Sequence, residues 1–202
     1  MKFSRLPHPC DGWETLSREL HFANTHLAVA TECVRTPQRP HGQSWTVVHR
    51  KAAVVIAPLT VDGKLVLIRQ ERIAIRAAIW EVPAGQIDDS AANDVAAIEA
   101  VALRELREET GYELGPGGEL VSLGHFFSSP GFTDEHGRFF IARGVRSAPE
   151  GHAHEASEAI LDCRAFASTE VARLIAANEI RDANTLGICA KLVASGLLTL
   201  HD

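Results

Sequence analysis

One stretch, residues 81–112, constrains this chain more than any other. It reads EVPAGQIDDSAANDVAAIEAVALRELREETGY: an apolar strand, a glycine-containing turn, and a long helix that ends in a dense set of carboxylates. An α-helix turns by about 100° per residue, so residues spaced 4, 3 and 4 apart lie on one narrow face. Four residues share that face: Ile98, Ala102, Glu105 and Glu109. Two acids therefore continue an apolar stripe.

Charged helix ends are usually solvated faces with ion pairs one turn apart. The helical wheel argues against that interpretation here, because Arg107 points to the solvent side while Glu105 and Glu109 follow the apolar line. Two like charges on a buried face repel each other and lose hydration. We therefore expect a hard cation to neutralise them, and ligands made only of oxygen suit Mg²⁺ or Mn²⁺ better than zinc.

Composition limits the class of protein. A chain of 202 residues is one domain, or one domain with an extension. Its net charge of -6 argues against sequence-independent binding to nucleic acid. No apolar run reaches membrane-spanning length, and the N-terminus lacks the apolar core of a signal peptide. The cysteines are scattered and form no CxxC pair, which favours free thiols in a reducing cytoplasm over disulfides or a zinc site: Cys10, Cys33, Cys163 and Cys189.

The N-terminal 50 residues are expected to form a small β extension. Prolines and a glycine make residues 1–25 irregular, with a short helix over Trp13–Leu20. Alternating apolar and polar residues predict strands over Thr25–Val34 and Ser44–His49, joined as a hairpin. Because such a small sheet is not stable alone, residues 1–50 must pack on the main domain, residues 51–202, or on another subunit.

Strands and helices alternate in the remaining chain. We expect strands over 51–58, 64–69, 78–83, 119–127, 138–145 and 159–166, and helices over 93–110, 168–177 and 184–195. Asn93 or Asp94 is the expected N-cap of the first helix and Gly111 its stop, and Ser168 or Thr169 caps the next helix. The GPGG sequence at 115–118 is expected to be a loop. The fold class is α/β, with a mixed sheet and helices on its faces.

The central stretch resembles the Nudix box, G-x5-E-x7-R-E-U-x-E-E-x-G-U, where U is apolar. Residues 104–112, RELREETGY, match every fixed position of its second half. Its first half departs from the pattern, because five extra residues separate it from Gly85. Ala91 or Ala96 stands where the first Glu is expected, depending on the direction of counting, and Glu99 is the only acid in the first turns of the helix.

Flanking segments extend the resemblance to the ADP-ribose pyrophosphatase-like subfamily of Nudix hydrolases. IRQER at 68–72, EVPAGQID at 81–88 and SPGFTDE at 129–135 are similar to segments of those enzymes. The proline of the last segment, Pro130, is the subfamily's distinguishing mark. The resemblance implies an α/β/α sandwich whose N-terminal strands exchange across a two-fold homodimer and help bind the base of the substrate.

The resemblance also implies metal ligands. Glu105 and Glu109 would hold Mg²⁺, or Mn²⁺, with Glu108 assisting and with the carbonyl of Ala84 as a further ligand. Arg104 would orient a carboxylate, although a plain surface arginine is the alternative. Divalent ions neutralise phosphate oxygens and activate water.

A general base in this family often comes from an acidic loop late in the chain. Glu158 is preferred to Glu155 because it lies nearer the following strand, and a solvated loop glutamate is an equally good interpretation of either. Arg69 and Arg72 could bind phosphate through bidentate hydrogen bonds. Arg72 is the better candidate because it lies beyond the strand end, and both could equally be surface charges.

Aromatic side chains could stack on a nucleobase. Trp45 and Phe132 are the candidates, beside Pro130, whereas Trp80 lies within a strand and is better explained as core. Glu81 would support the metal site from the same strand.

The expected activity is Mg²⁺-dependent hydrolysis of the pyrophosphate bond of ADP-ribose to AMP and ribose 5-phosphate, or of a related nucleoside diphosphate sugar. Another substrate, such as GDP-mannose or a damaged nucleoside triphosphate, is the first alternative, and Pro130 argues against triphosphates. A nucleotide-sensing Nudix domain without catalysis is the second, because the first half of the box is altered. The intact carboxylates of the second half favour an enzyme.

Overall fold

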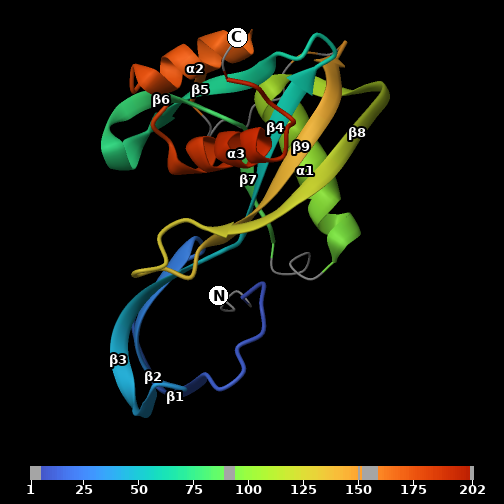
Figure 1. Cartoon of the computed structure of the whole chain (residues 1–202). Helices are drawn as coiled ribbons and strands as arrows, with labels where there is room; N and C mark the ends of the chain where they lie inside the picture. Colours follow the sequence, from blue (N-terminus) through green and yellow to red (C-terminus); the bar gives the residue numbers. More distant parts are fainter. Residues whose placement is uncertain (1–5, 89–93, 150, 152–158, 201–202) are drawn as a thin grey trace.

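Two β-sheets make up the β-structure of the protein in the computed structural model, which describes residues 6–88, 94–149, 151 and 159–200. The smaller sheet is antiparallel, has the order β1-β2-β3 and extends away from the helices (Figure 1). Its strands are β1 (Glu14–Ala23), β2 (Leu27–Thr36) and β3 (Arg39–Arg50).

The larger sheet has seven strands in the order β10-β5-β4-β9-β8, with β6 paired to β5 and β7 paired to β4. Its strands are β4 (Ala53–Thr60), β5 (Leu65–Arg72), β6 (Ala77–Glu81), β7 (Ala84–Gln86), β8 (Tyr112–Phe127), β9 (His136–Ser147) and β10 (Ile160–Phe166). β4 and β9 are parallel whereas the other pairs are antiparallel, so the sheet is mixed, as predicted. A short 3₁₀ turn, η1 (Ile73–Ile75), joins β5 to β6.

Helices cover both faces of this sheet (Figure 1). Side chains of β4 alternate between the two faces. Val54 and Ile56 pack with α1 (Val95–Thr110), whereas Val55 packs in the cluster that contains residues of α2 (Ser168–Ala176) and α3 (Ala183–Ala194). The predicted α/β/α sandwich is therefore confirmed.

The first helix begins and ends where its sequence predicts. The Asp94 carboxylate accepts hydrogen bonds from the backbone N–H groups of Ala96 and Ala97, at 3.0 and 3.3 Å. At the other end Gly111 adopts a left-handed φ of 69° and its N–H bonds the Arg107 carbonyl. These caps fix the length of α1 and hence the height of its C-terminal carboxylates above the sheet.

Local predictions failed at three places. The helix expected over Trp13–Leu20 is wrong, because β1 occupies that segment and pairs with β2. The GPGG sequence at 115–118 is not a separate loop but lies within β8, where the register with β9 shifts between Leu114 and Glu119. Neither Ser168 nor Thr169 is the N-cap of α2, because the helix begins at Ser168 and its N-cap is Ala167. The hairpin of β2 and β3 is confirmed, as part of a three-stranded sheet.

β3 fastens the small sheet to the loop between β8 and β9. The Val48 N–H donates to the Phe132 carbonyl at 2.8 Å, and the Thr133 hydroxyl donates to the Val48 carbonyl at 2.6 Å. The Trp45 indole N–H donates to the Gly131 carbonyl at 2.8 Å. The SPGFTDE loop, residues 129–135, thus holds the small sheet through these three hydrogen bonds.

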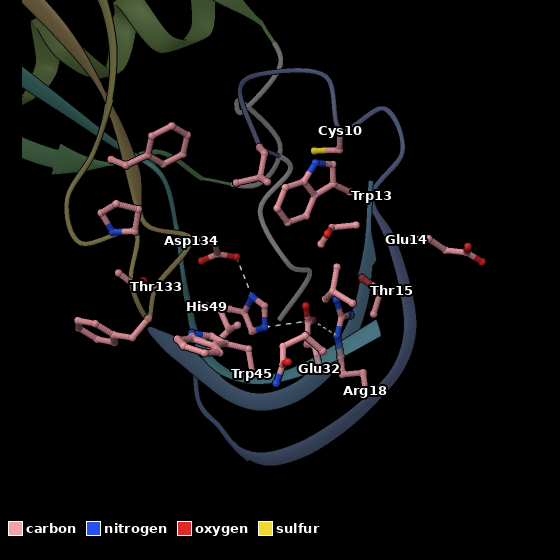
Figure 2. A pocket seen from close by; sticks show the side chains of 18 of the residues that line it. Cys10, Trp13, Glu14, Thr15, Arg18, Glu32, Trp45, His49, Thr133 and Asp134 are labelled. Atoms are coloured by element: carbon pink, nitrogen blue, oxygen red, sulfur yellow. Dashed lines mark hydrogen bonds and ion pairs between the residues drawn. The ribbon is translucent and has the colours of Figure 1, made fainter. Parts of the chain in front are cut away.

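A buried histidine adds a polar link between the small sheet and the β8–β9 loop. His49 is 4% exposed, and its Nδ1 lies 2.7 Å from Asp134 Oδ2 of the loop. Its Nε2 lies 3.4 Å from Glu32 Oε1 of β2, and Arg18 of β1 pairs with the same Glu32 oxygen at 2.5 Å. We name the trio of Glu32, His49 and Asp134 the His49 bridge (Figure 2).

Candidate active site

The turn after β6 lies against the C-terminal half of α1. Ala84 and Gly85 pair with Val55 and Val54 of β4, so the turn is anchored to the centre of the sheet. A Cβ built on Gly85 would lie 2.0 Å from Glu105 Cδ and 2.2 Å from Oε1. Because this space is already filled by the Glu105 carboxylate, the close approach of turn and helix requires glycine.

The two acids on the apolar stripe are buried. Glu109 is 2% exposed and accepts a hydrogen bond of 2.8 Å from the Ala84 N–H. Glu105 is 6% exposed. Arg104 donates to Glu105 Oε1 at 2.7 Å and to Glu108 Oε2 at 2.5 Å, so one guanidinium lies between two carboxylates. The structure therefore brings together Ala84, Arg104 and the three box glutamates.

Arg72 forms a bidentate pair with Glu81. Its Nε lies 2.8 Å from Oε1 and its Nη2 lies 2.5 Å from Oε2. Burial raises the pKa of the Glu81 carboxyl, while the hydrogen bonds and charge of Arg72 act in the opposite direction. The hydrogen bond to Glu81 raises the pKa of Arg72 in turn. Arg72, which the sequence predicts as a phosphate ligand, therefore binds the Glu81 carboxylate of the neighbouring strand β6.

Trp45, Pro130 and Phe132 lie elsewhere, around a cavity of about 700 Å³. The cavity lies between the small sheet and the β8–β9 loop, and the His49 bridge contributes to its wall (Figure 2). Trp45 is 55% exposed and Phe132 is 54% exposed. The lining residues that the structure describes do not include the carboxylates of α1. The predicted site residues thus form two groups, one at α1 and one at this cavity.

The remaining predicted residues fall outside these groups. Arg69 is exposed in the middle of β5, where it pairs with Trp80 of β6 and Asp162 of β10. Trp80 is buried in the core, as predicted. Glu155 and Glu158, the two candidate bases, lie outside the described residues.

Sequence reasoning missed the partners of these side chains. Asp134 lies in the SPGFTDE segment, which is the one sequence signal that points to this residue. Nothing in the sequence indicates that it lies close to His49 or that His49 lies close to Glu32. The β5–β6 register alone does not pair Arg72 with Glu81, because Arg72 faces Ala77 and Glu81 faces Ile68; the contact is made by the side chains. Within the described ranges, His, Cys, Asp and Glu side chains form no group of three or more arranged as metal ligands.

Known proteins resemble this chain in sequence and in fold. A family model of the NUDIX domain matches residues 48–186. An ADP-ribose pyrophosphatase of Mycobacterium tuberculosis is 31% identical over 191 residues, which cover 93% of this chain and 85% of that protein. An ADP-ribose pyrophosphatase of Bacillus subtilis is 28% identical over 172 residues, covering 85% and 88%.

A solved structure shows the same fold. The crystal structure of an ADP compounds hydrolase superposes with a TM-score of 0.72 at 16% sequence identity, covering 95% of this chain and all of that one. The family match spans the central sheet, α1 and the turn at Gly85. With its box glutamates gathered beside that turn, the chain belongs to the NUDIX family.

Proposed function

We propose that this protein hydrolyses the pyrophosphate bond of ADP-ribose, giving AMP and ribose 5-phosphate, or of a related nucleoside diphosphate sugar. The observation that carries the proposal is the burial of Glu105 and Glu109 on α1 beside the Ala84–Gly85 turn. Two buried carboxylates one helical turn apart are costly unless they bind a cation. The similarity to two ADP-ribose pyrophosphatases supports the choice of substrate.

Nudix hydrolases generally use divalent cations, and we propose Mg²⁺, with Mn²⁺ as an alternative. The chemistry of the donor set fits these ions, because it consists of oxygens alone: the Glu105, Glu108 and Glu109 carboxylates and the Ala84 carbonyl. Gly85 leaves the Glu105 carboxylate in a cradle that any side chain would fill. When bound, such a cation would neutralise the diphosphate and lower the pKa of water.

Other residues of the chain would orient the carboxylates, act as general base and bind phosphate. Arg104 would orient Glu105 and Glu108, between which its guanidinium lies. Glu158, or Glu155, would serve as general base. Arg69 is an alternative phosphate ligand, since Arg72 is bound to Glu81 and would act by orienting that carboxylate.

The cavity at the small sheet would hold the base. Trp45 and Phe132 present exposed rings there, and Pro130 also lines the cavity. Stacking of a purine on such rings is favourable and needs no specific hydrogen bonds.

A substrate panel assayed with Mg²⁺ tests the proposal. ADP-ribose, GDP-mannose and a nucleoside triphosphate would be compared by the nucleoside monophosphate released, first with the wild-type protein and then with Glu109→Gln. The substitution keeps the shape of the side chain and removes its charge, so we expect kcat to fall by about a hundredfold or more. Glu119→Gln is the control, because Glu119 forms a surface pair with Arg143 on β8 and β9.

No release of nucleoside monophosphate from any compound would refute the proposed activity. Full activity of folded Glu109→Gln would instead refute the assignment of the site. Calorimetry with ADP-ribose, with and without Mg²⁺, addresses the alternative of a nucleotide sensor, which the altered first half of the box favours. Binding without turnover would support the sensor.

A homodimer assembled through the N-terminal extension, residues 1–50, is part of the proposal, with residues 51–202 as the hydrolase domain. β1 is exposed along its whole length, and it carries Leu20 and Phe22, both more than half exposed. Apolar side chains gathered on an edge strand suit contact with a second copy. Light scattering should give a dimer mass for the wild type and a monomer for Leu20→Glu/Phe22→Glu, and a wild-type monomer would refute the dimer.

We also propose a cytoplasmic location. All four cysteines are free in the structure, as a reducing compartment allows. In the part of the chain that the structure describes, no helix is long and apolar enough to cross a membrane.

A further inference from the structure

The N-terminus of α3 holds the backbone of the segment that leads into the candidate active site. Asp182 caps this helix, and its Oδ2 accepts hydrogen bonds from both the N–H and the hydroxyl of Thr185, each 2.8 Å long. The Thr185 hydroxyl in turn accepts a hydrogen bond of 3.0 Å from the Val82 N–H. A carboxylate, a hydroxyl and a distant backbone amide thus form one chain across 103 residues of sequence.

This chain of hydrogen bonds is fully buried at its centre. Thr185 has no exposed surface and Val82 is 2% exposed. The hydroxyl has a single proton, and because that proton is directed to Asp182, a lone pair is left to face Val82. Hydrogen bonds to an ionised carboxylate are stronger than neutral ones, and a buried amide without a partner is costly. The position of the Val82 amide is therefore defined by Thr185.

The residues on either side of Val82 belong to the candidate site. Glu81 pairs with Arg72, the Pro83 carbonyl accepts the Ile56 N–H at 2.9 Å, and the Ala84 N–H donates to Glu109. α1 thus holds Ala84 from one face of the sheet. The cluster that contains Val82 and α3 lies on the other face.

We propose that Thr185 is a positioning residue for hydrolysis, which sets the segment from Glu81 to Gly85 against the carboxylates of α1. Asp182 orients the Thr185 hydroxyl. The inference rests on the proposed site, since it assigns no contact between Thr185 and substrate. A helix cap alone needs only the backbone bond from the Thr185 N–H to Asp182, and the second bond, to Val82, is what reaches the site.

Thr185→Val tests this role because it keeps the side-chain shape and removes the hydroxyl. With ADP-ribose and Mg²⁺, we expect kcat to fall by about 10- to 100-fold with KM changed less than about twofold, since small displacements of reacting groups have effects of that size. Thr185→Ser, which restores the hydroxyl, should recover most of kcat. Amide exchange by NMR gives a second readout: the Ala84 N–H, bonded to Glu109, should exchange faster in Thr185→Val.

Thr60→Val is the matched control. The Thr60 hydroxyl donates to Asp62 at 2.5 Å and accepts the Lys64 N–H at 2.9 Å, the same arrangement of carboxylate, hydroxyl and amide. It lies at the hairpin of β4 and β5, five residues along β4 from Val55, the partner of Ala84, or about 16 Å. We expect Thr60→Val to lower stability without changing kcat or the exchange of the Ala84 amide.

Three results would overturn the inference: an unchanged kcat in folded Thr185→Val, unchanged exchange of its Ala84 amide, or an equal loss of kcat in Thr60→Val. If Thr185→Val gives no folded protein, Asp182→Asn decides, because Asn caps helices as well as Asp but weakens the bond from the hydroxyl. A several-fold lower kcat in that variant supports the role, and an unchanged kcat refutes it. A wild-type protein without turnover would refute the proposed activity, whereas the Ala84 exchange experiment would still decide the role of Thr185.

Discussion

At the scale of single residues, Gly85 is a position with no room for a side chain. Gly85→Ala would place a methyl group 2.0 Å from Glu105 Cδ, so either the turn or the carboxylate must move. We expect a loss of about 1–3 kcal/mol in the free energy of unfolding, as for overpacked cores, together with a loss of turnover. Denaturant titration and the ADP-ribose assay measure the two effects.

Gly131→Ala serves as the stability control for that variant. A Cβ at Gly131 would meet no atom within 4 Å, so its free energy of unfolding should stay within about 0.5 kcal/mol of the wild type. Equal stabilities of Gly85→Ala and Gly131→Ala would contradict the close approach of turn and helix.

Arg72 and Glu81 predict a dependence of stability on pH. Burial raises the pKa of Glu81, and Arg72→Met would remove the cation that opposes burial, so the pKa would rise further. A carboxyl whose pKa is higher folded than unfolded binds more protons in the folded state, and stability then falls as pH rises through the interval between the two pKa values. We expect Arg72→Met to lose about 1–3 kcal/mol at about pH 8 and less at about pH 5.

Thermal unfolding of Arg72→Met across this pH range measures the effect. Arg69→Met is the control, because Arg69 is exposed on the same strand. An equal loss of stability at both pH values would contradict this prediction. It would show that the pKa of Glu81 in the folded variant is not raised by the removal of Arg72.

At the scale of elements, the site residues on α1 were predictable and their partners were not. Helical periodicity places Glu105 and Glu109 on the buried face from the sequence alone, because it is a local property. The bonds from Thr185 to Val82 and from His49 to Asp134 join residues 103 and 85 positions apart, and they depend on how sheets and loops pack. No local pattern records such packing.

The failures in secondary structure have a similar cause. Leu16 and Leu20 are spaced as on one face of a helix, yet tertiary pairing with β2 makes this segment a strand, with register shifts after Thr15 and Leu20. At 115–118, glycines that usually mark a loop fit within β8, because Cβ atoms at Gly115 and Gly118 would lie 2.9 Å from carbonyls of the β9 segment around Gly144. These glycines allow a close approach of two strands.

The His49 bridge predicts how the small sheet is held. His49→Leu would remove the imidazole that lies between the buried Glu32 and the half-buried Asp134. Leaving buried polar groups without a hydrogen-bond partner costs about 1–3 kcal/mol. We expect faster hydrogen exchange across residues 14–50 in the variant, with little change in α1, as measured by mass spectrometry.

His21→Leu is the matched control on the same sheet, since His21 is exposed and its Nε2 lies 2.8 Å from the Thr31 hydroxyl. Equal exchange in the two variants would contradict a specific role for the His49 bridge in docking. Faster exchange in α1 as well would show that the two parts unfold together.

At the scale of the whole molecule, burial predicts the reactivity of the thiols. Burial raises the pKa of Cys163 to about 12 and that of Cys189 to about 11, so both remain protonated near neutral pH. Because the thiolate is the reactive form, neither should react in the folded protein. Cys10 is exposed and Cys33 is half-buried.

An aromatic disulfide reagent should therefore label Cys10 first, then Cys33, and reach all four cysteines only in denaturant. Peptide mapping after timed labelling measures the order. Rapid labelling of Cys189 in the folded protein would contradict the packing of α3 against the sheet.

The attachment of the small sheet has a consequence for synthesis on the ribosome. β1, β2 and β3 are consecutive in sequence, so this meander can pair as soon as it leaves the exit tunnel. The residues that dock it, Gly131 to Asp134, are made 84 to 86 residues after the β3 groups they bind. At about 5–20 residues per second, that interval is roughly 4–17 s. We therefore expect the nascent chain to expose the apolar side chains of this sheet for seconds, a period in which chaperones can bind it.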